Sequence, residues 1–278
     1  MKVDCARLIC FSPTGRSRRV GEAILRGLQV ENTTLHDVTL HPDAELLIPP
    51  TEVAVIVVPV YGGHVAPVAV ERLKTIHGTD TLAVVVAVYG NRAYEKALVE
   101  LAELAEEQGF RVVAGAAFIG EHSYSTAANP IAAGRPTEED LAIASHFGGQ
   151  MAAKLRAAAS VEEVARVDLR KIGSPKQPLV PLLRFVWSVL RLRRSGLPQP
   201  KTPILPDEER CVHCGICVDR CPVGAIVRGD EWHTDATKCI RCCACVKGCP
   251  SQARVFETPF ATLLARNFKR QKQPQTLI

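Results

Sequence analysis

The sequence predicts a doubly wound α/β domain with a five-stranded parallel sheet, followed by a small cysteine-rich α+β module. Two observations lead to this prediction. The first 160 residues alternate β-branched apolar runs with stretches of helical periodicity, a pattern typical of parallel strands covered by helices on both faces. Beyond residue 200, nine of the eleven cysteines fall between residues 211 and 249, in two similar runs.

Four of the predicted strands are almost continuously apolar, and the fifth is weaker. The strong runs are residues 3–11, 51–61, 81–90 and 110–120, and the weak run is residues 32–39. Helical stretches separate them, and several of these end near a glycine. Such an alternation predicts a doubly wound sheet with the strand order 2-1-3-4-5, in which ligands bind at the carboxyl ends of the strands.

The chain divides into four predicted segments. These are an α/β domain, a basic linker, a cysteine module and a basic tail, at residues 1–160, 161–206, 207–257 and 258–278. Seven prolines between residues 173 and 206 argue against a domain there, although residues 181–194 have an amphipathic helical pattern. We expect this helix to clamp the two domains together. Peripheral contact with a membrane surface and docking of a partner protein are the alternatives.

The net charge of +5 is concentrated outside the two domains. Residues 160–206 carry 9 Lys/Arg against 3 Asp/Glu and residues 258–278 carry 4 against none, whereas residues 1–159 carry 14 against 18. No nucleic-acid-binding module accompanies this charge, so we expect no nucleic acid partner. No apolar stretch reaches the roughly 20 residues of a transmembrane helix. Clustered thiols and the absence of a signal-peptide pattern predict a cytoplasmic location.

Both cysteine runs, CVHCGICVDRCP and CIRCCACVKGCP, follow the pattern C-x2-C-x2-C-x3-C-P. This spacing resembles that of bacterial two-[4Fe–4S] ferredoxins, in which the fourth cysteine of each run binds the other cluster. Zinc sites use paired C-x2-C halves instead. The resemblance implies one cluster on Cys211, Cys214, Cys217 and Cys249, and a second on Cys239, Cys242, Cys245 and Cys221. The pattern does not require the ninth cysteine, Cys243, which we expect to pack beside its neighbour.

The loop CFSPTGRS, residues 10–17, follows the first predicted strand and has two interpretations. Cys-x5-Arg-Ser is the spacing of low-molecular-weight tyrosine phosphatases, which need a low-pKa thiolate and an Asp general acid. The chain lacks the Asp-Pro pair that carries the acid in that family, and Cys10 lies in an apolar run. We therefore favour the second interpretation, in which hydroxyls and N–H groups at a helix N-terminus hold a phosphate without attacking it.

The same loop, read as S-x-T-G-x-[ST], resembles the phosphate loop of flavodoxins. The resemblance implies an FMN phosphate held by Ser12, Thr14, Gly15, Arg16 and Ser17. Residues 59–67 and 88–98 follow later strands, where flavodoxins hold the isoalloxazine ring. Stacking and close backbone approach are expected from Pro59, Tyr61, Gly62, Gly63, Tyr89, Gly90, Asn91 and Tyr94. Residues 120–125, GEHSYS, add His122, Ser123 and Tyr124 as candidates, with a plain connecting loop as the alternative.

Taken together, the chain resembles the flavodoxin–ferredoxin fusion proteins of anaerobic microbes over nearly its whole length. The resemblance implies FMN, two [4Fe–4S] clusters, and electron transfer to or from a redox partner protein such as a ferredoxin or an oxidoreductase. No G-x-G-x-x-G fingerprint for a nicotinamide cofactor is present. The alternative is an FMN-dependent reductase of a small molecule such as a quinone, with His64, His122 or Tyr124 as proton donor. No catalytic residue is assigned beyond these.

Overall fold

The computed structural model describes residues 3, 5–40, 45–196 and 200–278. Residue 4 of the first predicted strand and residues 197–199 of the predicted linker lie outside the described residues. The chain divides into two compact units: the first contains residues 1–120, 134–175 and 272–278, and the second contains residues 121–133 and 176–271. Each unit is discontinuous in sequence, whereas the sequence analysis expects four consecutive segments.

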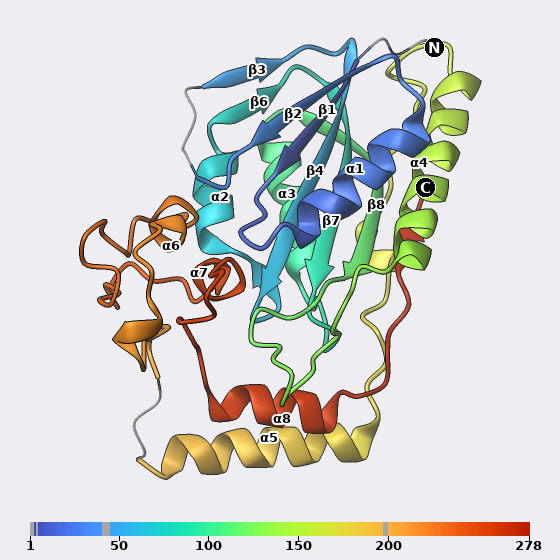
Figure 1. The fold of residues 1–278 in the computed structure, drawn as a ribbon. Coiled ribbons are helices and arrows are strands. Elements are labelled where there is room, and N and C mark those ends of the chain that lie inside the picture. Colours follow the sequence, from blue (N-terminus) through green and yellow to red (C-terminus); the bar gives the residue numbers. More distant parts are fainter. Residues whose placement is uncertain (1–2, 4, 41–44, 197–199) are drawn as a thin grey trace. The chain divides into compact units, whose positions relative to one another are not determined.

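The first unit is built on a sheet whose five long strands are all parallel. They are β1 (Cys5–Cys10), β2 (Asn32–Asp37), β4 (Glu52–Tyr61), β7 (Thr81–Tyr89) and β8 (Phe110–Ile119). Their order is β2-β1-β4-β7-β8, which is 2-1-3-4-5 when only these five are counted (Figure 1). A sixth, antiparallel strand, β9 (Gln275–Leu277), extends the sheet beyond β8 and is not anticipated by the sequence analysis.

Three shorter strands lie beside the main sheet. Strand β5 (His64–Val65) pairs with the end of β4, while β3 (Leu46–Ile48) and β6 (Ile76–Gly78) form a separate parallel pair. Helices α1 (Arg16–Leu28) and α4 (Glu138–Ala157) pack on one face of the main sheet. Helices α2 (Pro67–Leu73) and α3 (Ala97–Glu107) pack on the other, so the predicted doubly wound α/β fold is confirmed (Figure 1).

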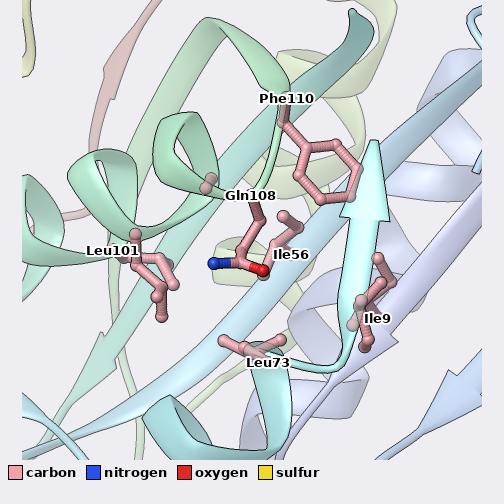
Figure 2. A pocket seen from close by; sticks show the side chains of 9 residues that line it. Ile9, Ile56, Leu73, Leu101, Gln108 and Phe110 are labelled. Atoms are coloured by element: carbon pink, nitrogen blue, oxygen red, sulfur yellow. The ribbon is translucent and has the colours of Figure 1, made fainter. Parts of the chain in front are cut away.

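The face covered by α2 and α3 encloses a small apolar hollow (Figure 2). It is lined by Ile9, Ile56, Leu73, Ile76, Leu101, Leu104, Ala105, Gln108 and Phe110. Its volume of about 10 Å³ leaves room for at most one water molecule. The amide oxygen of Gln108 is buried there without a hydrogen-bond partner among the described residues. The hollow is a packing defect of the core, because apart from Gln108 its lining is apolar and contains no cysteine.

The second unit contains the two cysteine runs and, apart from them, two helices that pack against each other. Helix α5 (Leu179–Arg194) lies within the predicted linker, where a helical pattern is expected at residues 181–194, and packs beside α8 (Pro259–Asn267) (Figure 1). The short helices α6 (Ile216–Asp219) and α7 (Ala244–Lys247) each follow the second cysteine of a run. Two single turns of 3₁₀ helix are η1 (Leu169–Lys171) in the first unit and η2 (Glu208–Arg210) in the second. None of the described helices is long and apolar enough to span a membrane.

Helices α1 and α4 cross so closely that glycine is required at the contact. A Cβ atom added to Gly27 would lie 1.8 Å from the carbonyl oxygen of Ser145, and one added to Gly148 would lie 2.2 Å from that of Ile24. Both contacts are with backbone atoms, which cannot swing aside as a side chain can. Gly149, the next residue of α4, would place its Cβ 3.7 Å from the nearest atom, the oxygen of Gly27.

This crossing predicts opposite effects of two neighbouring substitutions. We expect Gly148→Ala to lower the free energy of unfolding by about 1–3 kcal/mol, because the added methyl group forces the two helices apart. We expect Gly149→Ala to leave stability unchanged or to raise it by up to about 1 kcal/mol, because alanine favours the helix. Urea unfolding followed by far-ultraviolet circular dichroism measures both. Equal effects of the two variants would contradict the close crossing.

Candidate cofactor sites

The loop between β1 and α1 is held in shape by its own hydrogen bonds. The Ser12 hydroxyl accepts a hydrogen bond from the Arg18 backbone N–H at 3.0 Å, and the Ser12 N–H donates to the Thr39 hydroxyl at 2.7 Å. The N–H of Gly15 donates to the carbonyl oxygen of Ser12 at 2.9 Å. Gly15 has a φ of 78°, a left-handed conformation that glycine adopts at little cost. The conformation of the loop is thus fixed by contacts within the chain.

The open side of this loop has the properties of an anion site. The N-cap residue of α1 is Gly15, which has no side chain to cap the helix, and the first turn contains no acidic residue. The hydroxyls of Thr14 and Ser17 have no hydrogen-bond partner within the described part of the chain. A Cβ added to Gly15 would meet no atom within 4 Å, so the space in front of the loop is open. The hydroxyls and the positive end of the helix dipole together suit a phosphate.

Cys10 does not have the environment of a catalytic thiolate. Its side chain is fully buried in the sheet. Burial raises the pKa of the Cys10 thiol far above its usual value, and the negative charge of Asp37 acts in the same direction. A phosphatase cysteine needs the opposite, a depressed pKa and access to the substrate. The structure therefore favours a loop that binds phosphate over one that attacks it.

The loop after β4 is a tight hairpin. Tyr61 pairs with His64 across it, and the two residues between them, Gly62 and Gly63, have φ values of 64° and 94°. Two consecutive positive φ angles are the requirement of a two-residue hairpin turn, which explains the glycine pair. The carbonyl oxygen of Gly63 accepts hydrogen bonds from two N–H groups at the start of α3, each 3.0 Å long. Tyr61 is half-buried at the carboxyl end of β4.

The C-terminal segment packs against the loop after β7, so this loop does not face an open site. Tyr89 and Tyr94 are both 2% exposed, with ring centroids 5.4 Å apart. The Tyr94 hydroxyl lies 3.0 Å from Oε1 of Gln275, and Oδ1 of Asn91 accepts a hydrogen bond from the Lys272 N–H at 3.0 Å. Rings buried in this way present no face for flavin stacking, so we do not assign Tyr89, Tyr94 or Asn91 to a flavin site.

The GEHSYS loop belongs to the second unit, beside the second cysteine run. The ring of Tyr124 lies 4.9 Å from that of His122 and 5.0 Å from that of Phe256, between centroids. Nζ of Lys247, in α7, lies 2.8 Å from a carboxylate oxygen of Glu121. Burial raises the pKa of Tyr124 to about 12, with Cys243 acting in the same direction. The structure places His122 and Tyr124 near cysteines, and the flavin role expected for them gains no support.

The two cysteine runs fold into equivalent loops. Each short helix begins after a residue with positive φ: Gly215, at 73°, precedes α6, and Cys243, at 58°, precedes α7. The fourth cysteines also correspond, because Sγ of Cys221 accepts the Ala225 N–H at 3.2 Å and Sγ of Cys249 accepts the Ala253 N–H at 3.3 Å. Cys243 therefore stands where the first run has glycine, and it is almost fully buried.

A hollow in the second unit brings cysteines of both runs together. Its lining contains Cys221 of the first run and Cys239, Cys242 and Cys245 of the second, together with apolar residues and Cys243. Its volume is about 20 Å³, against about 10 Å³ for the hollow of the first unit. This is the crossed set that the sequence analysis expects for one cluster, and its thiol donors suit an iron–sulfur cluster. Among the described residues, no group of three or more His, Cys, Asp or Glu is arranged for a single metal ion.

The four cysteines of the other expected set are more open to solvent. Cys214 is exposed, and Cys211, Cys217 and Cys249 are partly buried, whereas Cys242 and Cys245 are buried. A cluster that is more exposed exchanges electrons more readily with an external partner, because electron transfer depends on close approach. The two candidate cluster sites are thus unequal in their access to solvent.

Sequence reasoning missed three features of these sites. The Thr39 hydroxyl accepts a hydrogen bond from the Ser12 N–H, and the segment after residue 271 is hydrogen-bonded to Asn91 and Tyr94. The third feature is Arg254, which is buried beside the cysteine hollow. Its only signal is its position in the repeat, where the first run has Ile226.

Comparison with known proteins gives one family match and several structural ones. Residues 204–227, which include the first cysteine run, match the family described as a 4Fe-4S binding domain. A search of curated proteins found no match. A flavodoxin from the domain Archaea is 16% identical over 55% of this chain and 99% of its own, with a TM-score of 0.35.

Two further solved structures are similar over the same half of the chain. A flavodoxin of Streptococcus pneumonia TIGR4 is 14% identical over 54% of this chain and 99% of its own, with a TM-score of 0.37. An NADH:FMN oxidoreductase in its apo form is 15% identical over 53% of this chain and 89% of its own, with a TM-score of 0.36. The structural matches cover about half of the chain, and the family match lies at residues 204–227.

The neighbouring Cys242 and Cys243 provide a test of the ligand set. We expect Cys243→Gly to keep the full iron content of about eight per chain, because glycine accepts the left-handed backbone and Cys243 is not a ligand. We expect Cys242→Ala to lose about half of the iron, because one cluster loses a thiolate. Iron analysis and electron paramagnetic resonance of the anaerobically purified chain measure this. Loss of iron in Cys243→Gly would make Cys243 a ligand.

Proposed function

We propose that this protein is an electron-transfer flavo-iron–sulfur protein, which passes electrons between FMN, two [4Fe–4S] clusters and a redox partner protein. The observation that carries the proposal is the hollow in which Cys221 meets Cys239, Cys242 and Cys245. A crossed set of three cysteines from one run and the fourth from the other is the arrangement of two-cluster ferredoxins. Flavins exchange one or two electrons and each cluster exchanges one, so the pair converts between the two modes.

In the first unit, the residues proposed to hold FMN lie in the loops that follow β1, β4 and β7. Ser12 keeps the phosphate loop in shape, while Thr14 and Ser17 donate their hydroxyls to the phosphate. Gly15 leaves space for the phosphate to come close to the backbone, and Arg16 is the first residue of α1, whose N-terminus faces the phosphate. Beside the isoalloxazine ring we place five residues at the end of β4 and in the loops after β4 and β7: Pro59, Tyr61, Gly62, Gly63 and Gly90.

In the second unit, the proposed cluster ligands are the eight cysteines of the two runs. One set is Cys239, Cys242, Cys245 and Cys221, and the other is Cys211, Cys214, Cys217 and Cys249. Their thiolates bind iron, and the N–H groups of Ala225 and Ala253 donate to sulfur. The more exposed second set is the proposed entry point for a cytoplasmic partner such as a ferredoxin or an oxidoreductase, attracted by the basic segments.

The proposed function predicts that electrons move between the flavin and the clusters. After anaerobic reduction with less than one equivalent of reductant, we expect stopped-flow absorbance to show flavin and cluster signals relaxing to a shared equilibrium. Electron paramagnetic resonance then shows both reduced species. A chain with FMN and iron bound but without exchange between them would exclude the proposal.

The phosphate loop is tested by FMN affinity, with a remote hydroxyl as the control. We expect Ser17→Ala to weaken FMN binding about 10- to 100-fold, because a hydrogen bond to a charged group contributes about 1.5–3 kcal/mol. Thr51→Ala removes an exposed hydroxyl beside the amino end of β4, where no ligand is proposed, and we expect it to leave the affinity unchanged. Fluorescence titration of the apoprotein with FMN measures both.

A further inference from the structure

Helix α5 presents a continuous apolar stripe that its own unit leaves uncovered. The buried side of the helix packs on α8 through Phe185, whose ring centroid lies 5.6 Å from that of Phe260 and 5.0 Å from that of Phe268. At 100° per residue, six other apolar side chains fall within an arc of about 120° beside that contact. They are between 45% and 74% exposed: Leu179, Val180, Leu183, Val186, Trp187 and Leu190.

The same helix is strongly basic. It carries four arginines, two of them at its C-terminal end, and no acidic residue: Arg184, Arg191, Arg193 and Arg194. The guanidinium of Arg191 lies 5.5 Å from the ring centroid of Trp187, so a cation and an aromatic ring share one edge of the stripe. Helix α8 likewise contains no acidic residue and is followed by Lys269 and Arg270.

From this combination we propose that α5 docks the protein on an anionic phospholipid surface. A bilayer uses both features at once, because apolar side chains enter the acyl boundary while arginines bind the phosphate headgroups. Trp187 with Arg191 is the amphipathic pairing that membrane interfaces favour. The helix is 16 residues long, too short to cross the hydrocarbon core, so it lies in the plane of the surface. An acidic protein would match the arginines but leave most of the apolar stripe without a partner.

The test compares two adjacent positions of α5 in the full-length protein. Trp187 lies in the apolar stripe, whereas Ser188 is partly buried and lies outside it, and either residue changed to Glu adds the same charge. Sedimentation with phosphatidylcholine vesicles, and with mixed phosphatidylcholine–phosphatidylglycerol vesicles, measures binding. We expect the wild type to bind the mixed vesicles at least tenfold more tightly than the neutral ones.

The two variants separate charge from apolar insertion. We expect Ser188→Glu to weaken binding to the mixed vesicles about fivefold or less, the effect of one charge near an anionic surface. We expect Trp187→Glu to weaken it at least tenfold further, because an aromatic anchor is also lost. Equal effects of the two variants, or no sedimentation of the wild type, would overturn the proposal. So would a dimer in light scattering that Trp187→Glu dissociates, since a second copy would then cover the stripe.

A separate observation concerns Arg254, a cation buried near the cysteines. It is 2% exposed, and its terminal nitrogens donate to the carbonyl oxygens of Glu231 and Pro203 and to the Thr234 hydroxyl. Its Nε–H has no oxygen or nitrogen acceptor among the described residues. Within the same residues, no carboxylate forms an ion pair with it. A buried guanidinium without an anion is costly, so the site calls for a negative group.

Arg254 lies beside the cysteine hollow, because two of the residues to which it donates, Pro203 and Thr234, belong to the lining of that hollow. The thiolates of the crossed set line the same hollow and would supply the negative charge: Cys221, Cys239, Cys242 and Cys245.

We infer that Arg254 is a positioning residue that raises the reduction potential of the cluster on Cys221, Cys239, Cys242 and Cys245. A buried cation stabilises the more negative, reduced cluster over the oxidised one, and its Nε–H, which has no acceptor among the described residues, is available to cluster sulfur. The first run has the apolar Ile226 at the equivalent place, so the two clusters differ in this charge. The inference rests on the proposed clusters, whose presence is established first by iron analysis.

Redox titration followed by electron paramagnetic resonance tests Arg254 in the full chain with both clusters. We expect Arg254→Gln to shift the reduction equilibrium of one cluster at least tenfold towards the oxidised form, which is 59 mV for a one-electron couple. The control is Lys238→Gln, which removes an exposed cation next to the ligand Cys239. Water screens that charge, so we expect a shift below threefold.

Two outcomes would contradict the role of Arg254. One is an unchanged potential in Arg254→Gln with a full iron content. If Arg254→Gln does not assemble its clusters, the reduction potentials of Arg254→Lys are measured instead, because this variant keeps the positive charge and loses the Nε–H donor. We expect its equilibrium to shift two- to tenfold in the same direction, and an unchanged potential there would be the second contradiction.

Discussion

Parallel pairing of β1, β4 and β7 is the interaction on which the first unit depends. The register sets Cys10 of β1 opposite Val57, and Pro59 of β4 opposite Val88. Each strand therefore ends at the same edge of the sheet, and the loops that follow are neighbours although up to 80 residues separate them. The closely crossed helices α1 and α4 fix one face, so the N-terminus of α1 is held at that edge by packing.

Backbone conformation imposes a comparable constraint on the second unit. Each cysteine run must turn sharply between its second and third cysteines, and a residue with positive φ makes that turn. The first run uses Gly215, whereas the second tolerates Cys243 at the same angle. The side chain of Cys243 is almost fully buried, which removes its thiol from solvent. We expect packing, and not an extra ligand, to account for this residue at the turn.

Periodicity was sufficient to predict the parallel strands. Cysteine spacing indicated which four cysteines lie at one hollow, and their role as cluster ligands stays a prediction. Both patterns are local and repeat at fixed intervals. The placement of Tyr94 and Asn91 was beyond the same reasoning, because they are hydrogen-bonded to a segment 181 residues further along the chain. The sequence shows that these residues follow a strand, but it does not show what packs on them. Arg254 escaped notice for a related reason, since only the folded unit reveals that its charge is buried.

The C-terminal segment gives the first unit a dependence on the whole chain. Strand β9 covers the edge of β8 that would otherwise present unpaired N–H and C=O groups, and Lys272 and Gln275 hold the loop after β7. Residues 176–271, which contain both cysteine runs, must be made before this strand can pair. The loop at the proposed flavin edge therefore reaches its final form only after the cysteine module has been synthesised. The first unit is thus completed by residues that follow both cysteine runs in the chain, even though each unit has its own core.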